Sequence, residues 1–132
     1  MSGMAGAREV TAEASLLARM IAVMPNALSL VAAGDGTILY TNETWDRTFG
    51  YEHGEAAGLH LSAVSAPSDE TLPGERVREV TRDIARSGTW TGDMQQLRKD
   101  GIRFSCTETI WQFEDEQRGP IWVTVYGEPS FS

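Results

Sequence analysis

The sequence has little cysteine, little positive charge and no long apolar run. Its 132 residues include one cysteine, Cys106, which excludes an intramolecular disulfide and favours a reducing, cytoplasmic environment. The 11 Lys and Arg against 19 Asp and Glu give a net charge of -8, which argues against direct binding to nucleic acid or to an anionic membrane. The most apolar stretch, residues 16–33, is interrupted by Arg19, Pro25 and Asn26 and should not span a bilayer.

Sequence patterns of catalysis and metal binding are also missing. The two histidines, His53 and His60, do not have the spacing of zinc ligands. We find no Ser-His-Asp order and no phosphate-binding glycine loop, since the glycines at 34 and 36 precede a strand-like segment rather than a helix. The sequence therefore predicts neither an enzyme nor a metal site.

The composition does support one folded domain. A hydrophobic fraction of 41% is enough for a core, and the length suits a single domain. We divide the chain into a flexible N-terminus with an amphipathic flanking helix (1–24), a domain (25–128) and a tail or start of a linker (129–132). The end directly after the last predicted strand suggests a cut before an effector, such as a kinase or a DNA-binding region.

Residues 8–24 have the pattern of an amphipathic helix. Val10, Leu17 and Met24 recur every seven residues, and Pro25 ends the pattern. The apolar face predicts packing on the domain itself or pairing with a second copy of the chain. The sequence leaves both arrangements open.

A hairpin and a short helix are predicted next. The apolar runs 27–33 and 37–41 flank a Gly-Asp-Gly turn, which indicates a β-hairpin. Asn42 occupies the position of an N-cap, and Gly50 that of a helix-ending glycine. Between them, Trp45 and Phe49 lie four residues apart on one helix face.

The second half predicts helices followed by three strands. One helical turn is expected at 62–66, and a second clear helix at 74–87. Its predicted apolar face holds Val77, Val80, Ile84 and Ala85. Strands are predicted at 90–97, 103–113 and 121–126. This order indicates an α+β fold, with one five-stranded antiparallel sheet and short helices on one face.

Several segments in this order resemble a PAS domain over residues 25–127. The first half matches at Gly36-Thr37-Ile38-Leu39-Tyr40-Thr41-Asn42, Trp45, Phe49-Gly50-Tyr51, Glu55 and Gly58. The second half matches at Trp90-Thr91-Gly92, Arg98-Lys99-Asp100-Gly101, Phe104, Glu108 and Gly119. The resemblance implies a sheet cupped by short helices around a small cavity. It also implies an input module that holds haem, flavin or a metabolite, or that binds only protein partners.

Departures from the family pattern narrow these expectations. Light-sensing LOV members carry a reactive cysteine in a segment that here reads Leu59-His60-Leu61-Ser62-Ala63-Val64, so the resemblance excludes covalent flavin photochemistry. Haem is disfavoured because the helix at 74–87 contains no histidine. The closing Asp-Ile-Thr motif of the family is replaced by Gly127-Glu128-Pro129-Ser130, which puts the usual output linkage in doubt.

Strand alternation places Phe104, Cys106, Glu108 and Ile110 on one face. Cys106 is a redox sensor only if cationic groups stabilise its thiolate, and its sequence neighbours favour a buried structural role. If this face lines the cavity, Glu108 either accepts hydrogen bonds from a ligand or is satisfied internally.

Trp90, Gly92 and Gln96 suggest a flavin bound without a covalent bond, by resemblance to family members with tryptophan-x-glycine at this point. The side-chain amide of Gln96 would then donate and accept hydrogen bonds at the edge of the isoalloxazine ring. The alternative is a core tryptophan with a surface glutamine. Asn42 and Tyr126 complete the residues that we predict to line the cavity.

Two functions follow from these expectations. The first is a sensory module, the input part of a sensor kinase or transcriptional regulator, that binds a small molecule and signals through its flanking helices. The second is a ligand-free PAS fold that forms homodimers or binds protein partners. The dimer would form through the N-terminal helix or the outer sheet face, with Trp111, Trp122 or Val123 as anchors.

Overall fold

The computed structural model describes residues 20, 24–66 and 75–131. The predicted helix at 8–24 lies largely outside these residues. The elements, in chain order, are β1 (Leu28–Ala32), β2 (Ile38–Thr41), α2 (Glu43–Phe49), the 3-10 turn η1 (Leu61–Ala63), α3 (Glu75–Ser87), β3 (Thr89–Leu97), β4 (Arg103–Asp115) and β5 (Gly119–Tyr126).

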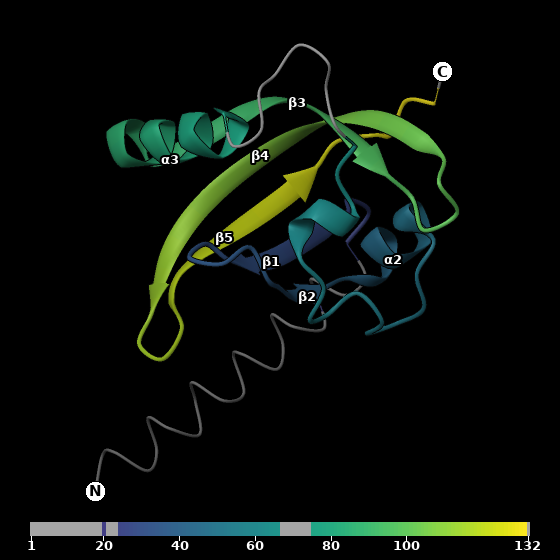
Figure 1. Ribbon diagram of the computed structural model, residues 1–132, viewed down its shortest axis with the longest axis horizontal. Coiled ribbons are helices and arrows are strands. Elements are labelled where there is room, and N and C mark those ends of the chain that lie inside the picture. Colours follow the sequence, from purple (N-terminus) through teal and green to yellow (C-terminus); the bar gives the residue numbers. More distant parts are fainter. Residues whose placement is uncertain (1–19, 21–23, 67–74, 132) are drawn as a thin grey trace, which may run out of the picture.

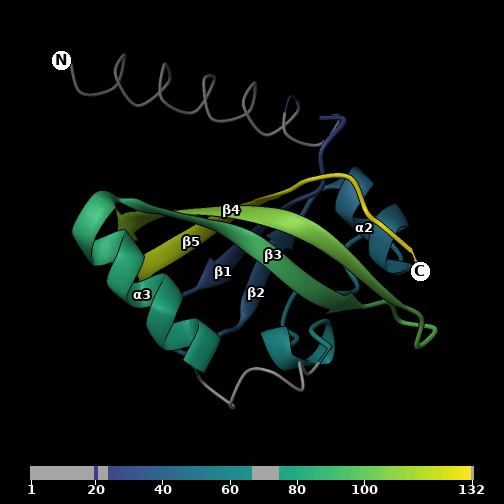
Figure 2. The ribbon, with the colours of Figure 1, turned by 90° about the horizontal axis from the view of Figure 1, so that it is seen from above.

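The strands form one antiparallel sheet in the order β2-β1-β5-β4-β3, so the last strand lies in its centre (Figure 1). α2 and α3 cover opposite ends of one face, as Figure 2 shows from above. The predicted five-stranded α+β fold is therefore confirmed. Of the helices in the described part of the chain, none has the length and apolar character that a membrane span requires.

Turn and cap residues explain where the elements begin and end. Asn42 Oδ1 accepts a hydrogen bond from the Trp45 amide at 2.9 Å, which caps α2, and Gly50 ends that helix with a φ of 80°. Gly36 closes the β1–β2 hairpin with a φ of 76°, and a Cβ there would lie 2.6 Å from His60 Nε2. The predicted hairpin and cap are confirmed.

The apolar face of α3 is narrower than predicted. Val80 and Ile84 are buried, whereas Val77 is 54% exposed and Ala85 also lies in solvent. Only one stripe of the helix meets the sheet, because Val80 and Ile84 pack over Trp90, Ile110 and Trp122 at one end of the strands. We call these five residues the α3 cluster. The prediction for Val77 and Ala85 is wrong for this reason.

The outer sheet face carries two exposed aromatic side chains. Trp111 is 45% exposed and Phe113 is 44% exposed, and Val123 is the Cα partner of Trp111. Trp122 points the other way, into the α3 cluster, and its Nε1 donates to Gln112 Oε1 at 2.9 Å. Since adjacent residues of a strand alternate faces, Trp122 cannot join Val123 on the outer face, and that part of the prediction is wrong.

Candidate functional site

The predicted site residues are all buried, and three of them form a polar cluster inside the domain. Cys106 and Glu108 lie on β4, and Gln96 lies on the neighbouring β3. Gln96 Nε2 donates hydrogen bonds to Glu108 Oε2 and, at 3.6 Å, to Cys106 Sγ. We call these residues the Gln96 cluster. Gln96 is therefore not the surface glutamine of the alternative reading.

A second group of buried apolar side chains, which we call the α2 cluster, packs beneath α2 and includes Trp45, Phe49, Phe104, Cys106 and Tyr126. Glu108 lies on β4 between Cys106 of the α2 cluster and Ile110 of the α3 cluster, where its side chain is withdrawn from water. Burial raises the pKa of its carboxyl group to about 7, and this rise is opposed by the hydrogen bond from Gln96 and by the positive charge of Arg76 on α3. Both protonation states are therefore accessible near neutral pH. A group of this kind responds to small changes in its surroundings.

Cys106 has the environment of a structural thiol. Burial, followed by the negative charge of Glu108, raises the pKa of the thiol to about 12. The thiol is consequently protonated at neutral pH, and a thiolate redox reaction is disfavoured. This supports the structural reading of Cys106.

Tyr126 extends the polar groups onto β5. Its backbone is the Cα partner of Glu108, and its hydroxyl forms a 2.9 Å hydrogen bond with the Ser29 hydroxyl on β1. Burial raises the pKa of the phenol, with the nearby Glu108 adding to the effect. Ser29 was not among the predicted site residues, although strand alternation from Val31 places it on the inner face.

Trp90 lies apart from the Gln96 cluster, within the α3 cluster. Its Nε1 donates to Glu79 Oε1 at 3.2 Å, and the Arg76 guanidinium lies 5.6 Å from the centre of its ring. A Cβ on Gly92 would lie 2.5 Å from the indole ring. The tryptophan-x-glycine pair is thus a packing arrangement in which glycine makes room for the ring, which supports the reading of Trp90 as a core residue.

Asn42 binds backbone groups where the chain enters the domain. Its Oδ1 accepts from the Leu28 amide at 3.0 Å as well as from Trp45, and its Nδ2 donates to the Asn26 carbonyl at 3.0 Å. The structure therefore does not bring Asn42 into the Gln96 cluster. Direct ligand binding by any of the predicted residues stays a prediction.

Aromatic rings fill the space between the Gln96 cluster and α2. Trp45 stacks on Phe49 with ring centres 4.1 Å apart. Phe49 in turn meets the edges of Phe104 at 5.1 Å and Tyr126 at 5.6 Å. A ligand at the Gln96 cluster would therefore have to move side chains of this core.

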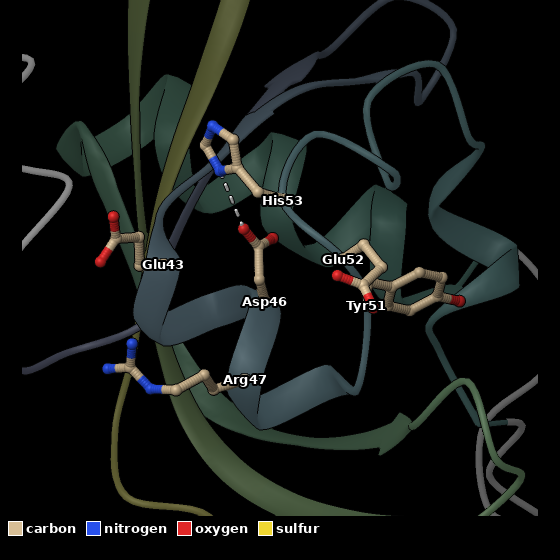
Figure 3. Close-up of a pocket in the computed structure, with 6 residues that line it drawn as sticks. All are labelled: Glu43, Asp46, Arg47, Tyr51, Glu52 and His53. Atoms are coloured by element: carbon tan, nitrogen blue, oxygen red, sulfur yellow. Dashed lines mark ion pairs between the residues drawn. The ribbon is translucent and has the colours of Figure 1, made fainter.

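A shallow acidic depression lies on the outer side of α2 (Figure 3). Its volume is about 270 Å³, and its walls are formed by Glu43, Asp46, Arg47, Tyr51, Glu52 and His53. Asp46 is buried, with Oδ1 accepting from Thr41 at 2.6 Å and Oδ2 lying 3.5 Å from His53 Nδ1. No sequence pattern predicts that this carboxylate is buried, because its position next to Trp45 does not reveal which side of a short helix is covered.

The described residues offer no group of three or more His, Cys, Asp and Glu side chains that could hold a metal ion. The depression at α2 is shallow, and its buried carboxylate Asp46 pairs with His53, so we assign it no ligand.

Comparison with known proteins identifies the fold family. The model of the PAS domain family matches residues 25–126. The chain belongs to the PAS domain family. The predicted resemblance is confirmed, and members of this family serve as sensory and signalling modules. No curated protein matches the sequence.

Solved PAS domains share this fold at low sequence identity. A PAS domain from a two-component sensor histidine kinase has a TM-score of 0.72 at 14% identity, covering 90% of this chain and 98% of that one. A PAS domain from Colwellia psychrerythraea has a TM-score of 0.68 at 21% identity, with coverages of 83% and 92%. A PAS domain of a LuxR-family transcriptional regulator from Burkholderia thailandensis, in complex with ethanol, has a TM-score of 0.64 at 19% identity, with coverages of 82% and 94%.

Proposed function

We propose that this PAS domain is the input module of a sensor kinase or transcriptional regulator, and that the Gln96 cluster is its sensing element. The observation behind this proposal is Glu108, a carboxyl group buried in the inner sheet face with a side-chain amide as its partner. Buried carboxyl groups of shifted pKa are concentrated at functional sites. The family supplies the sensory context.

The chemistry of the cluster suggests a small polar ligand. A carboxyl group and an amide together present hydrogen-bond donors and acceptors, and a ligand that offers the complementary groups can replace the bond between Gln96 and Glu108. A non-covalently bound flavin is one candidate, since its ring edge has such groups. The ethanol complex of the LuxR-family PAS domain supports small ligands as another class.

Hydrogen bonds from Tyr126 and α2 to residues 24–26 support signalling through the N-terminal flank. Asn26 Nδ2 donates to the carbonyl of Tyr126 at 3.1 Å, and Thr44 of α2 donates to the Met24 carbonyl at 2.6 Å. Movement of Tyr126 would therefore change how the entering chain is held. A ligand shifts this equilibrium only as far as it binds the two arrangements with different affinity.

The proposal is tested by an absorption spectrum of the purified protein and by thermal melting with flavins and a panel of small alcohols, acids and amides. We expect a ligand to raise the Tm of the wild type. Gln96→Leu should abolish that rise, whereas Gln95→Leu, on the exposed side of β3, should retain it. A colourless protein whose Tm no compound changes would argue against the sensing role.

The alternative is a ligand-free dimerisation module, favoured by the exposed Trp111 and Phe113 and by the ring-to-ring packing of the interior. Sedimentation of the full chain and of a chain lacking residues 1–24 tests it. A dimer that Trp111→Ser dissociates would support this function. A monomer in both forms would exclude it.

A further inference from the structure

One buried donor in the α2 cluster has no hydrogen bond. The Trp45 side chain is fully buried, and no protein group among residues 20, 24–66 and 75–131 accepts a hydrogen bond from its Nε1. The buried indoles of Trp90 and Trp122 both donate to side-chain oxygens. A buried donor without a partner is costly, and buried polar groups in folded proteins nearly always have one. The Trp45 indole therefore marks a position where an acceptor from outside the protein would bind.

Two hydroxyl groups lie beside this indole. The Tyr126 hydroxyl forms its 2.9 Å hydrogen bond with the Ser29 hydroxyl, and both residues are buried. Burial raises the pKa of the Tyr126 phenol, whereas Ser29 and the Trp45 indole lower it. The indole nitrogen therefore lies close to the phenol oxygen, although the two do not meet the geometry of a hydrogen bond. We call Trp45, Ser29 and Tyr126 the Trp45 subsite.

The polar groups of the Trp45 subsite favour a ligand with an acceptor atom. An indole N–H can only donate, whereas a hydroxyl group donates or accepts. One oxygen atom of a ligand has two lone pairs, so it can accept from the Trp45 indole and from the hydroxyl of Tyr126 or Ser29 at the same time. A carbonyl or hydroxyl oxygen meets this requirement.

The charge around the subsite favours an uncharged ligand. After burial, the largest effect on the pKa of Tyr126 is the negative charge of Glu108, which raises it further. Among the described residues that shift this pKa, none is basic. An anion would therefore enter the interior beside a carboxyl group and without a cationic partner, which is costly. An alkylammonium cation has no lone pair to offer the indole N–H.

Aromatic packing limits the ligand to a few non-hydrogen atoms. The ring of Phe49 stacks on Trp45 with centres 4.1 Å apart and meets Tyr126 edge-on at 5.6 Å. A molecule as large as a flavin would have to displace several rings, whereas an alcohol or an amide needs far less space. Tyr126 also borders a surface hollow of about 70 Å³, beside Thr44 and Thr48 of α2, and a molecule of this size would approach Tyr126 from there.

We propose that the Trp45 subsite binds a small uncharged molecule through a carbonyl or hydroxyl oxygen that accepts a hydrogen bond from the Trp45 indole. This inference rests on the proposed sensory function and names the class of its ligand, with alcohols and amides favoured over flavins. Glu108 is the Cα partner of Tyr126, so the Trp45 subsite adjoins the Gln96 cluster. A ligand held by Trp45 and Tyr126 therefore acts directly on the surroundings of Glu108.

NMR of the indole N–H groups of the full chain tests this assignment. Acetamide or ethanol should move the Trp45 signal downfield, because its proton gains an acceptor. The Trp90 and Trp122 signals should stay in place, since both indoles already have acceptors. The exposed Trp111 indole reports any effect of the compounds on the solvent. Acetate and ethylammonium, charged molecules of the same size, should leave the Trp45 signal unmoved.

Trp45→Phe identifies the Trp45 signal and removes the donor, while it keeps an aromatic ring against Phe49. It should weaken acetamide binding about tenfold, through the loss of one buried hydrogen bond. Trp122→Phe is the matched control, because it removes an indole donor from the α3 cluster and should bind acetamide as the wild type does. If Trp45→Phe does not fold, the four indole signals of the wild type decide the question.

A rise in Tm that acetamide causes equally in the wild type and in Trp45→Phe, with an unmoved Trp45 signal, would overturn the Trp45 subsite and leave the proposed sensing role intact. Acetate or ethylammonium moving the Trp45 signal as far as acetamide does would overturn the ligand class. A Trp45 signal that acetamide moves in Gln96→Leu as in the wild type would support the subsite and count against Gln96 as the sensing element. A Trp45 signal that no compound moves would overturn the proposal.

Discussion

Glu108 links the stability of this domain to pH. Its pKa rises from 4.5 to about 7 on folding, so the folded state favours the neutral carboxyl group. Its contribution to the free energy of unfolding is complete below pH 4.5 and is lost as the pH rises through 7, a change on the order of 3 kcal/mol.

Urea unfolding of the wild type and of Glu108→Gln between pH 5 and 8 measures this dependence. The side chain at position 108 is then neutral at every pH, so the free energy of unfolding of Glu108→Gln should fall much less than that of the wild type as the pH rises. Glu114→Gln replaces an exposed carboxylate and should show the same fall as the wild type. Equal pH slopes for Glu108→Gln and wild type would show that Glu108 ionises normally.

Gly92 leaves no room for a larger side chain, because the Trp90 ring covers it. Gly92→Ala places a Cβ 2.5 Å from that ring, and we expect a loss of about 1–3 kcal/mol of stability from overpacking. Gly34→Ala is the control, since no atom lies within 4 Å of the added Cβ. Urea unfolding of both variants checks this, and equal stabilities would mean that the indole ring moves aside without cost.

At the scale of elements, Asn42 holds β1 and α2 together. Asn42→Ala removes the α2 cap and the acceptor of the Leu28 amide, and should lower the free energy of unfolding by about 2 kcal/mol. Asn42→Asp keeps the acceptor but loses the donor to Asn26 and should cost less. Chemical denaturation measures the free energy of unfolding of both variants. If Asn42→Asp loses as much as Asn42→Ala, the stabilisation comes from the hydrogen bond that Asn42 donates to Asn26 and not from the α2 cap.

Local signals in the sequence predicted most elements, and contacts between elements explain the rest. The Gly-Asp-Gly turn, the Asn42 cap and the alternation along β4 depend on neighbours in sequence, and these predictions are confirmed. The pairing of Gln96 with Glu108 depends on the register of β3 against β4, which alternation alone does not set. The burial of Asp46 likewise depends on packing that no local pattern records.

At the scale of the whole molecule, the two apolar clusters share the same strands. β4 and β5 both contribute to the α2 cluster and to the α3 cluster, which predicts a single cooperative transition. In urea, NMR amide signals from α2 and α3 should vanish with one midpoint. Earlier loss of the α3 signals would show that α3 unfolds as a separate unit.

The central place of β5 also has a consequence for the order of synthesis. β1 needs Val125, Thr124 and their neighbours as partners, and these residues leave the ribosome almost a hundred positions after Leu28. Until then the β1–β2 and β3–β4 hairpins are separate pieces, each with an unpaired edge. A nascent chain that stalls before residue 119 therefore cannot join its two hairpins into one sheet. The strand edges of β1 and β4 that later pair with β5 stay unpaired, and a chaperone or a second nascent chain would bind there.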